Sequence, residues 1–199
     1  MELDFYFDFG SPASYLAYKR LRQLESEYDL TVHWLPMLLG GVFKATGNVS
    51  PVTVAAKGNY MVNQDFPRFA KRYSVPMQFN PHFPINTLNL MRAAIAAQQL
   101  GCFDAYADAI FDAMWQEQCN LGDTEQVAMV LTKAGLEAQA LMDLSQQPDI
   151  KATLITNTEH AVSRGVFGAP TMFVGEEMYF GQDRLDFVEA AILLEKDGR

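Results

Sequence analysis

The sequence has little cysteine or histidine, and neither is arranged for the chemistry that it usually supports. The two cysteines, Cys102 and Cys119, lie too far apart to form the Cys-x-x-Cys pair of a disulfide oxidoreductase. We predict that both are idle free thiols in a reducing compartment. The three histidines, His33, His82 and His160, show no metal-ligand spacing, so we predict that the protein binds no metal.

Long apolar runs and a surplus of basic residues are also missing. No apolar run approaches the roughly 18 residues that a membrane span needs, so we expect no membrane partner. Acidic residues (24) outnumber lysine and arginine (15), and this formal net charge of −9 argues against a nucleic-acid partner. The start of the chain, Met1–Asp4, has no positive charge before an apolar stretch and is not typical of a signal peptide. We therefore expect a cytoplasmic location.

Apolar residues are plentiful, at 49% of the chain, and their spacing predicts an α/β protein with a sizeable core. The order of elements predicts a thioredoxin-like βαβ–ββα fold that carries a large, all-helical insertion. We assign residues 1–38 and 165–199 to the thioredoxin-like domain and residues 39–164 to the insertion domain. The expected strands span 2–9, 31–35, 170–174 and 178–180, and the expected helices span 12–28, 60–73, 86–100, 103–116, 123–134, 136–144, 148–164 and 183–194.

The first strand runs into the first helix through a short polar segment. Gly10 allows a sharp exit from the strand, Ser11 is a suitable N-cap residue, and Pro12 suits the first helical position. A hydroxyl in this position lies beside free backbone N–H groups and the positive end of a helix dipole. The segment therefore predicts either a site for an anion, such as a phosphate, carboxylate or thiolate, or merely a helix cap.

Two motifs resemble those of the DsbA-like thioredoxin superfamily. The segment Ser11–Ser14 occupies the place where DsbA-like oxidoreductases carry Cys-x-x-Cys, and Gly168–Thr171 resembles their cis-proline loop. Over nearly its whole length, the chain most closely resembles the family of 2-hydroxychromene-2-carboxylate isomerases and kappa-class glutathione transferases. The matching segments are Asp4–Asp8 with Ser11-Pro12 and Ser14-Tyr15-Leu16, Gly47-Asn48 with Lys57-Gly58, Val166–Thr171, and Phe180–Leu185.

The resemblance implies that glutathione is the cofactor and that Ser11 is the catalytic residue, with its hydroxyl bonded to the glutathione sulfur. Asn48 and Lys57 would contact the tripeptide, Lys57 at the glycyl carboxylate. Ala169, before a cis-Pro170, would offer its backbone to the cysteinyl part. The γ-glutamyl end would be held by the segment that comprises Phe180, Gly181, Gln182 and Asp183.

Each of these residues also has a simpler interpretation. Asn48 follows a glycine and suits a turn, Lys57 could be a solvated charge, and Asp183 could be only a helix cap. The Pro170 loop could be purely structural.

The resemblance implies a glutathione-dependent isomerase, in which a bound thiolate adds reversibly to a conjugated aromatic substrate. The first alternative is a kappa-class-like transferase that conjugates small electrophiles, and the second is a non-catalytic thioredoxin-like binding module. The isomerases of naphthalene catabolism place a lysine and an asparagine–arginine pair near the substrate carboxylate. Here Lys44 is displaced by one residue and the asparagine–arginine pair is absent, so the sequence does not establish that the substrate is an aryl-pyruvate. Relatives are often homodimers, which we expect here too.

Overall fold

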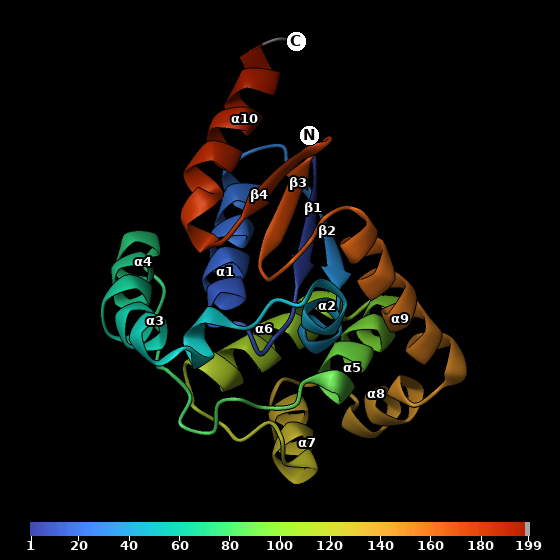
Figure 1. The fold of residues 1–199 in the computed structure, drawn as a ribbon. Coiled ribbons are helices and arrows are strands. Elements are labelled where there is room, and N and C mark those ends of the chain that lie inside the picture. Colours follow the sequence, from blue (N-terminus) through green and yellow to red (C-terminus); the bar gives the residue numbers. More distant parts are fainter. Residues whose placement is uncertain (198–199) are drawn as a thin grey trace.

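The computed structural model describes residues 1–197, which form one four-stranded sheet surrounded by helices (Figure 1). The strand order is β2-β1-β3-β4, with β1 parallel to β2 and antiparallel to β3. The thioredoxin-like topology predicted from the sequence is confirmed. The strands are β1 (Glu2–Phe7), β2 (Thr31–Pro36), β3 (Thr171–Val174) and β4 (Glu177–Phe180).

The two helices of the thioredoxin-like unit lie beside the sheet, and all the other helices fall between β2 and β3, as expected. The first group is α1 (Pro12–Glu27) and α10 (Leu185–Asp197), the latter preceded by the 3-10 turn η3 (Gln182–Arg184). The second group is α2 (Leu39–Thr46), the 3-10 turn η1 (Pro51–Thr53), α3 (Ala55–Tyr60), the π-helical turn η2 (Met61–Asp65), α4 (Phe66–Tyr73), α5 (Leu88–Gln99), α6 (Phe103–Trp115), α7 (Thr124–Lys133), α8 (Ala138–Ser145) and α9 (Pro148–Ser163).

The first strand ends at Phe7, two residues earlier than predicted. The carboxylate of Asp8 accepts hydrogen bonds from Gly10 N at 2.9 Å and from Leu39 N at 2.8 Å. The Asp8 carbonyl accepts from Ser11 N at 3.0 Å, which closes a turn directly before α1. The prediction of a strand to residue 9 was therefore wrong, because this aspartate turns the chain toward the helix.

The prediction of a helix over residues 60–73 is confirmed, although the helical stretch begins earlier, at Ala55 of α3. The π-helical turn lies inside this stretch, with right-handed helical backbone angles on both sides, and Pro67 lies in the first turn of α4. Residues 74–87, with Pro76, Pro81 and Pro84, form no helix until α5 begins at Leu88.

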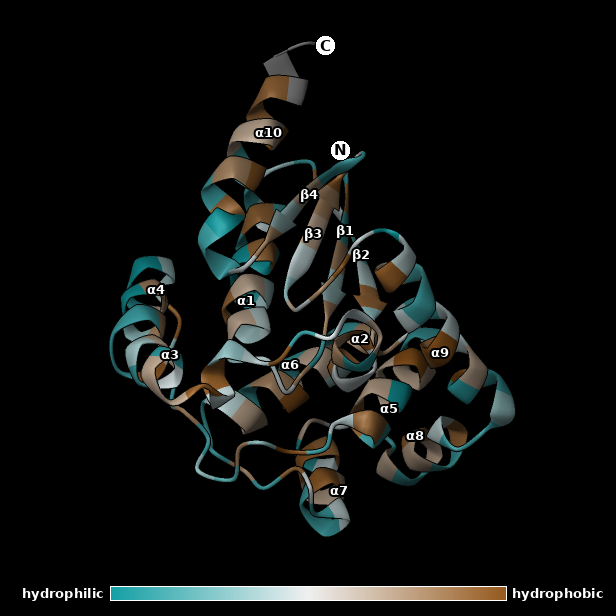
Figure 2. Cartoon of the chain, in the orientation of Figure 1, coloured by the Kyte–Doolittle hydropathy of each residue, from teal (hydrophilic) through white to brown (hydrophobic). Residues whose placement is uncertain are grey.

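The core is continuous from the sheet into the helical segment. Side chains of Phe7 and Phe9 pack with Phe111 of α6, the Phe9 and Phe111 ring centroids lying 4.6 Å apart. The Trp115 indole N–H donates to the Phe9 carbonyl at 2.8 Å. In Figure 2, brown and teal residues are mixed along the strands and the helices around them, whereas the outlying α4 is mostly teal, that is, hydrophilic. The division at residues 38 and 165 stays a prediction.

Residues 1–197 contain no helix that is both long and apolar enough to cross a bilayer.

Candidate active site

The N-terminus of α1 is built as the sequence predicts. Ser11 is the N-cap, with extended backbone angles, and its Oγ accepts a hydrogen bond from Ser14 N at 3.1 Å. Pro12 occupies the first turn, which contains no acidic side chain to neutralise the positive end of the helix dipole. The Ser11 side chain is almost buried, so its hydroxyl faces a restricted space.

The loop before β3 meets Ser11 from the other end of the chain. The Ala169–Pro170 peptide bond is cis, which confirms the prediction. The Ser11 hydroxyl donates to the Ala169 carbonyl oxygen at 3.1 Å, and the Gly181 N–H donates to the Pro170 carbonyl oxygen at 3.0 Å. Among the described residues, the Ala169 N–H has no partner. An extended ligand backbone could therefore bond to this residue.

Ser11 and Ala169 line a cavity of about 300 Å³. Its lining brings together most of the predicted site residues. Lys57 is the exception, since it lines a shallow neighbouring pocket that shares Pro51 and Met61 with this cavity. Pro170 lies directly behind the lining and is buried. The predicted residues in the lining are Ser11, Asn48, Ala169, Phe180, Gly181, Gln182 and Asp183.

One part of the cavity is acidic. It is lined by Asp65, which the sequence analysis missed, and by Asp183 and Arg184. Asp183 pairs with Arg184 at 2.7 Å, and Asp65 accepts a hydrogen bond from Gln182 Nε2 at 3.2 Å. Burial, and then the nearby charge of Asp183, raises the pKa of Asp65 above its usual value. Two neighbouring carboxylates with one arginine suit a ligand group that carries both an ammonium and a carboxylate.

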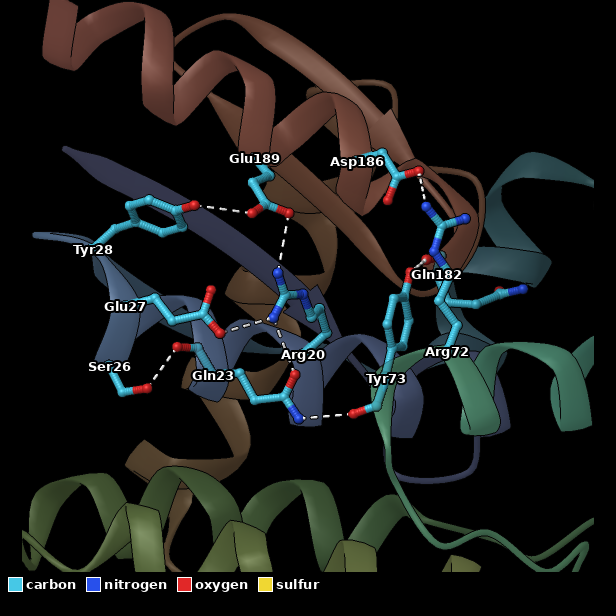
Figure 3. Close-up of polar contacts among 10 residues, drawn as sticks. All are labelled: Arg20, Gln23, Ser26, Glu27, Tyr28, Arg72, Tyr73, Gln182, Asp186 and Glu189. Atoms are coloured by element: carbon cyan, nitrogen blue, oxygen red, sulfur yellow. Dashed lines mark hydrogen bonds and ion pairs between the residues drawn. The ribbon is translucent and has the colours of Figure 1, made fainter.

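Contacts among α4, α1 and α10 hold this part of the site in place (Figure 3). The hydroxyl of Tyr73, at the end of α4, donates to the Gln182 carbonyl at 2.6 Å. Burial raises the pKa of Tyr73 to about 12, so the phenol remains a donor. Arg72 pairs with Asp186 at 2.6 Å beside it. The turn that carries Asp183 is thereby fixed against the helix that follows Asp65.

Asn48 is held in the wall by two hydrogen bonds of its own. Its Nδ2 donates to the Phe167 carbonyl at 2.8 Å, and its Oδ1 accepts from Val49 N at 2.9 Å. The side chain therefore connects the end of α2 to the cis-proline loop. Its contact with a ligand stays a prediction, and the glycyl-carboxylate contact of Lys57 also stays one.

The helical segment supplies an apolar wall of the cavity. Phe43, Met61 and Phe66 line the cavity, and Leu39 and Val52 adjoin them. Other large apolar residues of the helical segment lie elsewhere, for example Met91, which is fully buried in the core. This wall can receive an apolar substrate beside Ser11.

Neither thiol of the chain belongs to this cavity. Cys102 and Cys119 are both free. Burial, followed by the charge of Glu117, raises the pKa of Cys119, which makes it a poor nucleophile. Among residues 1–197, no group of three or more His, Cys, Asp or Glu could hold a metal ion.

Comparisons with known proteins show the family to which the chain belongs. The model of the DsbA-like thioredoxin domain matches residues 2–193. The chain is 34% identical to a 2-hydroxychromene-2-carboxylate isomerase of Pseudomonas putida over 96% of this chain and 94% of that protein. It is 27% identical to glutathione S-transferase kappa 1 of Rattus norvegicus, over 98% and 91% of the two chains.

A solved structure of a 2-hydroxychromene-2-carboxylate isomerase superposes with a TM-score of 0.88 at 32% identity, covering 100% of this chain and 98% of that one. Both the sheet and the helical segment are therefore shared with that protein. The chain belongs to the DsbA-like thioredoxin domain family and, within it, to the family of the 2-hydroxychromene-2-carboxylate isomerases.

Proposed function

We propose that this chain is a glutathione-dependent isomerase that acts on a conjugated aromatic substrate. The observation that carries the proposal is the position of the Ser11 hydroxyl, which lies at the N-terminus of α1 and 3.1 Å from the carbonyl of Ala169, in a cavity that also contains Asp65 and Asp183. The relatives named as isomerases and glutathione transferases support the same activity.

The residues of the cavity fit glutathione in three respects. Asp65 and Asp183 suit the γ-glutamyl ammonium, and Arg184 suits its carboxylate. The N–H and carbonyl of Ala169 can bond to the cysteinyl backbone, as a neighbouring strand would. The Ser11 hydroxyl and the N-terminus of α1 would then face the sulfur and favour its anionic form.

When bound, glutathione would supply a thiolate that can add reversibly to a conjugated double bond. In the structure, the Ser11 hydroxyl donates a hydrogen bond to the carbonyl oxygen of Ala169. To bond to the sulfur, this hydroxyl has to rotate away from the carbonyl. The cysteinyl N–H of the ligand can replace it as donor to Ala169. The apolar wall around Phe43 and Phe66 would exclude water and orient the aromatic body of the substrate.

A specific observation favours the transferase as a second candidate. Among the described lining residues, Arg184 is the one cation, and it is already paired with Asp183. A substrate carboxylate would find little attraction beside Phe43, whereas an uncharged electrophile would fit. In this case the thiolate would remain in the product instead of being released.

Calorimetric titration with glutathione tests the shared part of both candidates. We expect binding in the micromolar to millimolar range, and no heat at millimolar glutathione would refute both. Turnover then separates them: cis–trans isomerisation of an aryl-pyruvate supports the isomerase, and conjugation of chlorodinitrobenzene alone supports the transferase. A protein that binds glutathione but turns over neither substrate would be the binding module.

The cytoplasmic location and the homodimer stay predictions. Light scattering measures the mass of the particle in solution, and a single mass close to the 22.3 kDa of one chain would contradict the homodimer.

A further inference from the structure

A second and larger cavity, of about 590 Å³, lies between α2, α5 and α9, which are side by side in Figure 1. It shares no lining residue with the candidate active site, because the two use different faces of α2. Leu39 and Phe43 face the active site, whereas Gly41 and Lys44 face this cavity. Its volume is within the range of small-molecule sites.

Most of the wall is apolar. One stripe of α9 faces the cavity, with residues recurring at the helical spacing from Lys151 to Val162. Within this stripe Leu154 is buried and Ile155 is 58% exposed. The apolar members of the wall are Leu38, Ala45, Leu88, Leu154, Ile155 and Val162.

The charges around this cavity oppose those of the whole chain. Lys44, Arg92 and Lys151 line it, against one acidic residue, Glu159, although the chain carries a net charge of −9. Among the side chains that the structure describes, none of these three cations has an ion-pair partner. An apolar cavity with unneutralised positive charges suits an anion that has an apolar body.

Arg92 provides the most specific indication. Its Nε is buried and has no hydrogen-bond acceptor within the described protein. A buried N–H donor without an acceptor is unfavourable, and such groups are rare in native structures. Arg92 lines the cavity, and its two terminal nitrogens, which are not enclosed like Nε, also make no hydrogen bond within the described protein. These two nitrogens can bind a carboxylate through two parallel hydrogen bonds.

We propose that this cavity is a binding site for a small carboxylate with an apolar body, such as an arenecarboxylate, and that Arg92 binds the carboxylate. Leu154 and Ile155 contact the apolar body, and Lys44 and Lys151 add attraction at the entrance. The proposal is independent of glutathione, because no residue of the active-site cavity takes part.

The test is calorimetric titration of the full chain with 2-naphthoate, with uncharged 2-naphthamide for comparison. We expect naphthoate to bind below millimolar concentration and the amide at least tenfold more weakly. Arg92→Met keeps the apolar stem and removes the donors, so affinity should fall at least tenfold. Its melting temperature should be unchanged or higher, because no native hydrogen bond is lost.

Two further variants make the result decisive. Lys151→Met should weaken binding severalfold, whereas Lys71→Met, which removes one exposed charge on α4, should leave it unchanged. Absence of naphthoate binding at millimolar concentration would overturn the proposal. Equal affinity for acid and amide would also overturn it. An isotherm unchanged by both Arg92→Met and Lys151→Met would place the ligand elsewhere, the active-site cavity included, and would overturn it too.

Discussion

The proposed function gives the hydroxyl of Ser11 a second role beside that of helix cap, and replacing Ser11 with alanine should reveal both. As an N-cap it accepts from Ser14 N, so Ser11→Ala should lower the free energy of unfolding by about 1 kcal/mol. For a chain of this length, this corresponds to a fall in melting temperature of about 2–4 °C. As a donor to the proposed glutathione thiolate it would make a charge-assisted hydrogen bond, worth about 1.5–3 kcal/mol.

The free energy of this hydrogen bond to the thiolate corresponds to a shift of about one to two pKa units in the bound glutathione thiol. If the site lowers this pKa by about two units, roughly three-quarters of the thiol is ionised at neutral pH. In Ser11→Ala the ionised fraction should fall to between about a quarter and a few per cent. Ultraviolet absorbance of the thiolate against pH, at saturating glutathione, measures the change.

A matched control isolates the cap from the chemistry. Asp123 is the N-cap of α7, away from the cavity, and accepts from Glu125 N at 2.9 Å. Asp123→Ala should lower the melting temperature like Ser11→Ala but leave the thiol pKa unchanged. If Ser11→Ala also left the thiol pKa unchanged, Ser11 would be only a cap and the reasoning would be refuted.

Three further substitutions test the site and its frame. Asp65→Asn should weaken glutathione binding about tenfold. Because burial and Asp183 raise the pKa of Asp65, its contribution to stability is present below the usual pKa and is lost as pH rises through the raised pKa. Glutathione affinity should show the opposite trend and fall as pH drops through that raised pKa. Calorimetry against pH measures the affinity, and urea unfolding against pH measures the stability. An affinity that does not change with pH would contradict the contact between Asp65 and the ammonium. Ser14→Ala should raise the free energy of unfolding by about 1 kcal/mol in urea, because the buried Ser14 Oγ has no partner; a clear loss would contradict this. Gly58→Ala should lower both the melting temperature and glutathione affinity, because a Cβ there overlaps the carbonyl of Val52 in the cavity wall. Unchanged values of both would contradict this prediction and show that the backbone at Val52 can move without cost.

The sequence was most informative where short-range rules decide the structure. Ser11 and Pro12 specify a cap and a first helical turn within two residues, and the structure confirms both. The long helices followed from apolar periodicity, since one face of each packs on the core. The cis form of Pro170 followed only from the family resemblance, because local sequence gives it a low probability.

Distant contacts explain what the sequence did not predict. The early end of β1 depends on a hydrogen bond between Asp8 and Leu39, which no local pattern indicates. Asp65 stands among mixed charges, and only folding brings it beside Gln182 and Asp183. Residues 74–87 stay outside the helices, and their three prolines (Pro76, Pro81 and Pro84) were the visible local signal for that break.

The pairing of β1 with β3 has a consequence for biosynthesis. Asp4 faces Phe173 across the sheet, so the two halves of the candidate active site are translated at opposite ends of the message. While the ribosome is still producing the helical segment, the apolar β1 has β2 on one edge and nothing on the other, an arrangement prone to pairing with foreign strands. The nascent chain therefore completes the candidate active-site cavity last, and a premature stop before the β3–β4 hairpin would leave an aggregation-prone intermediate.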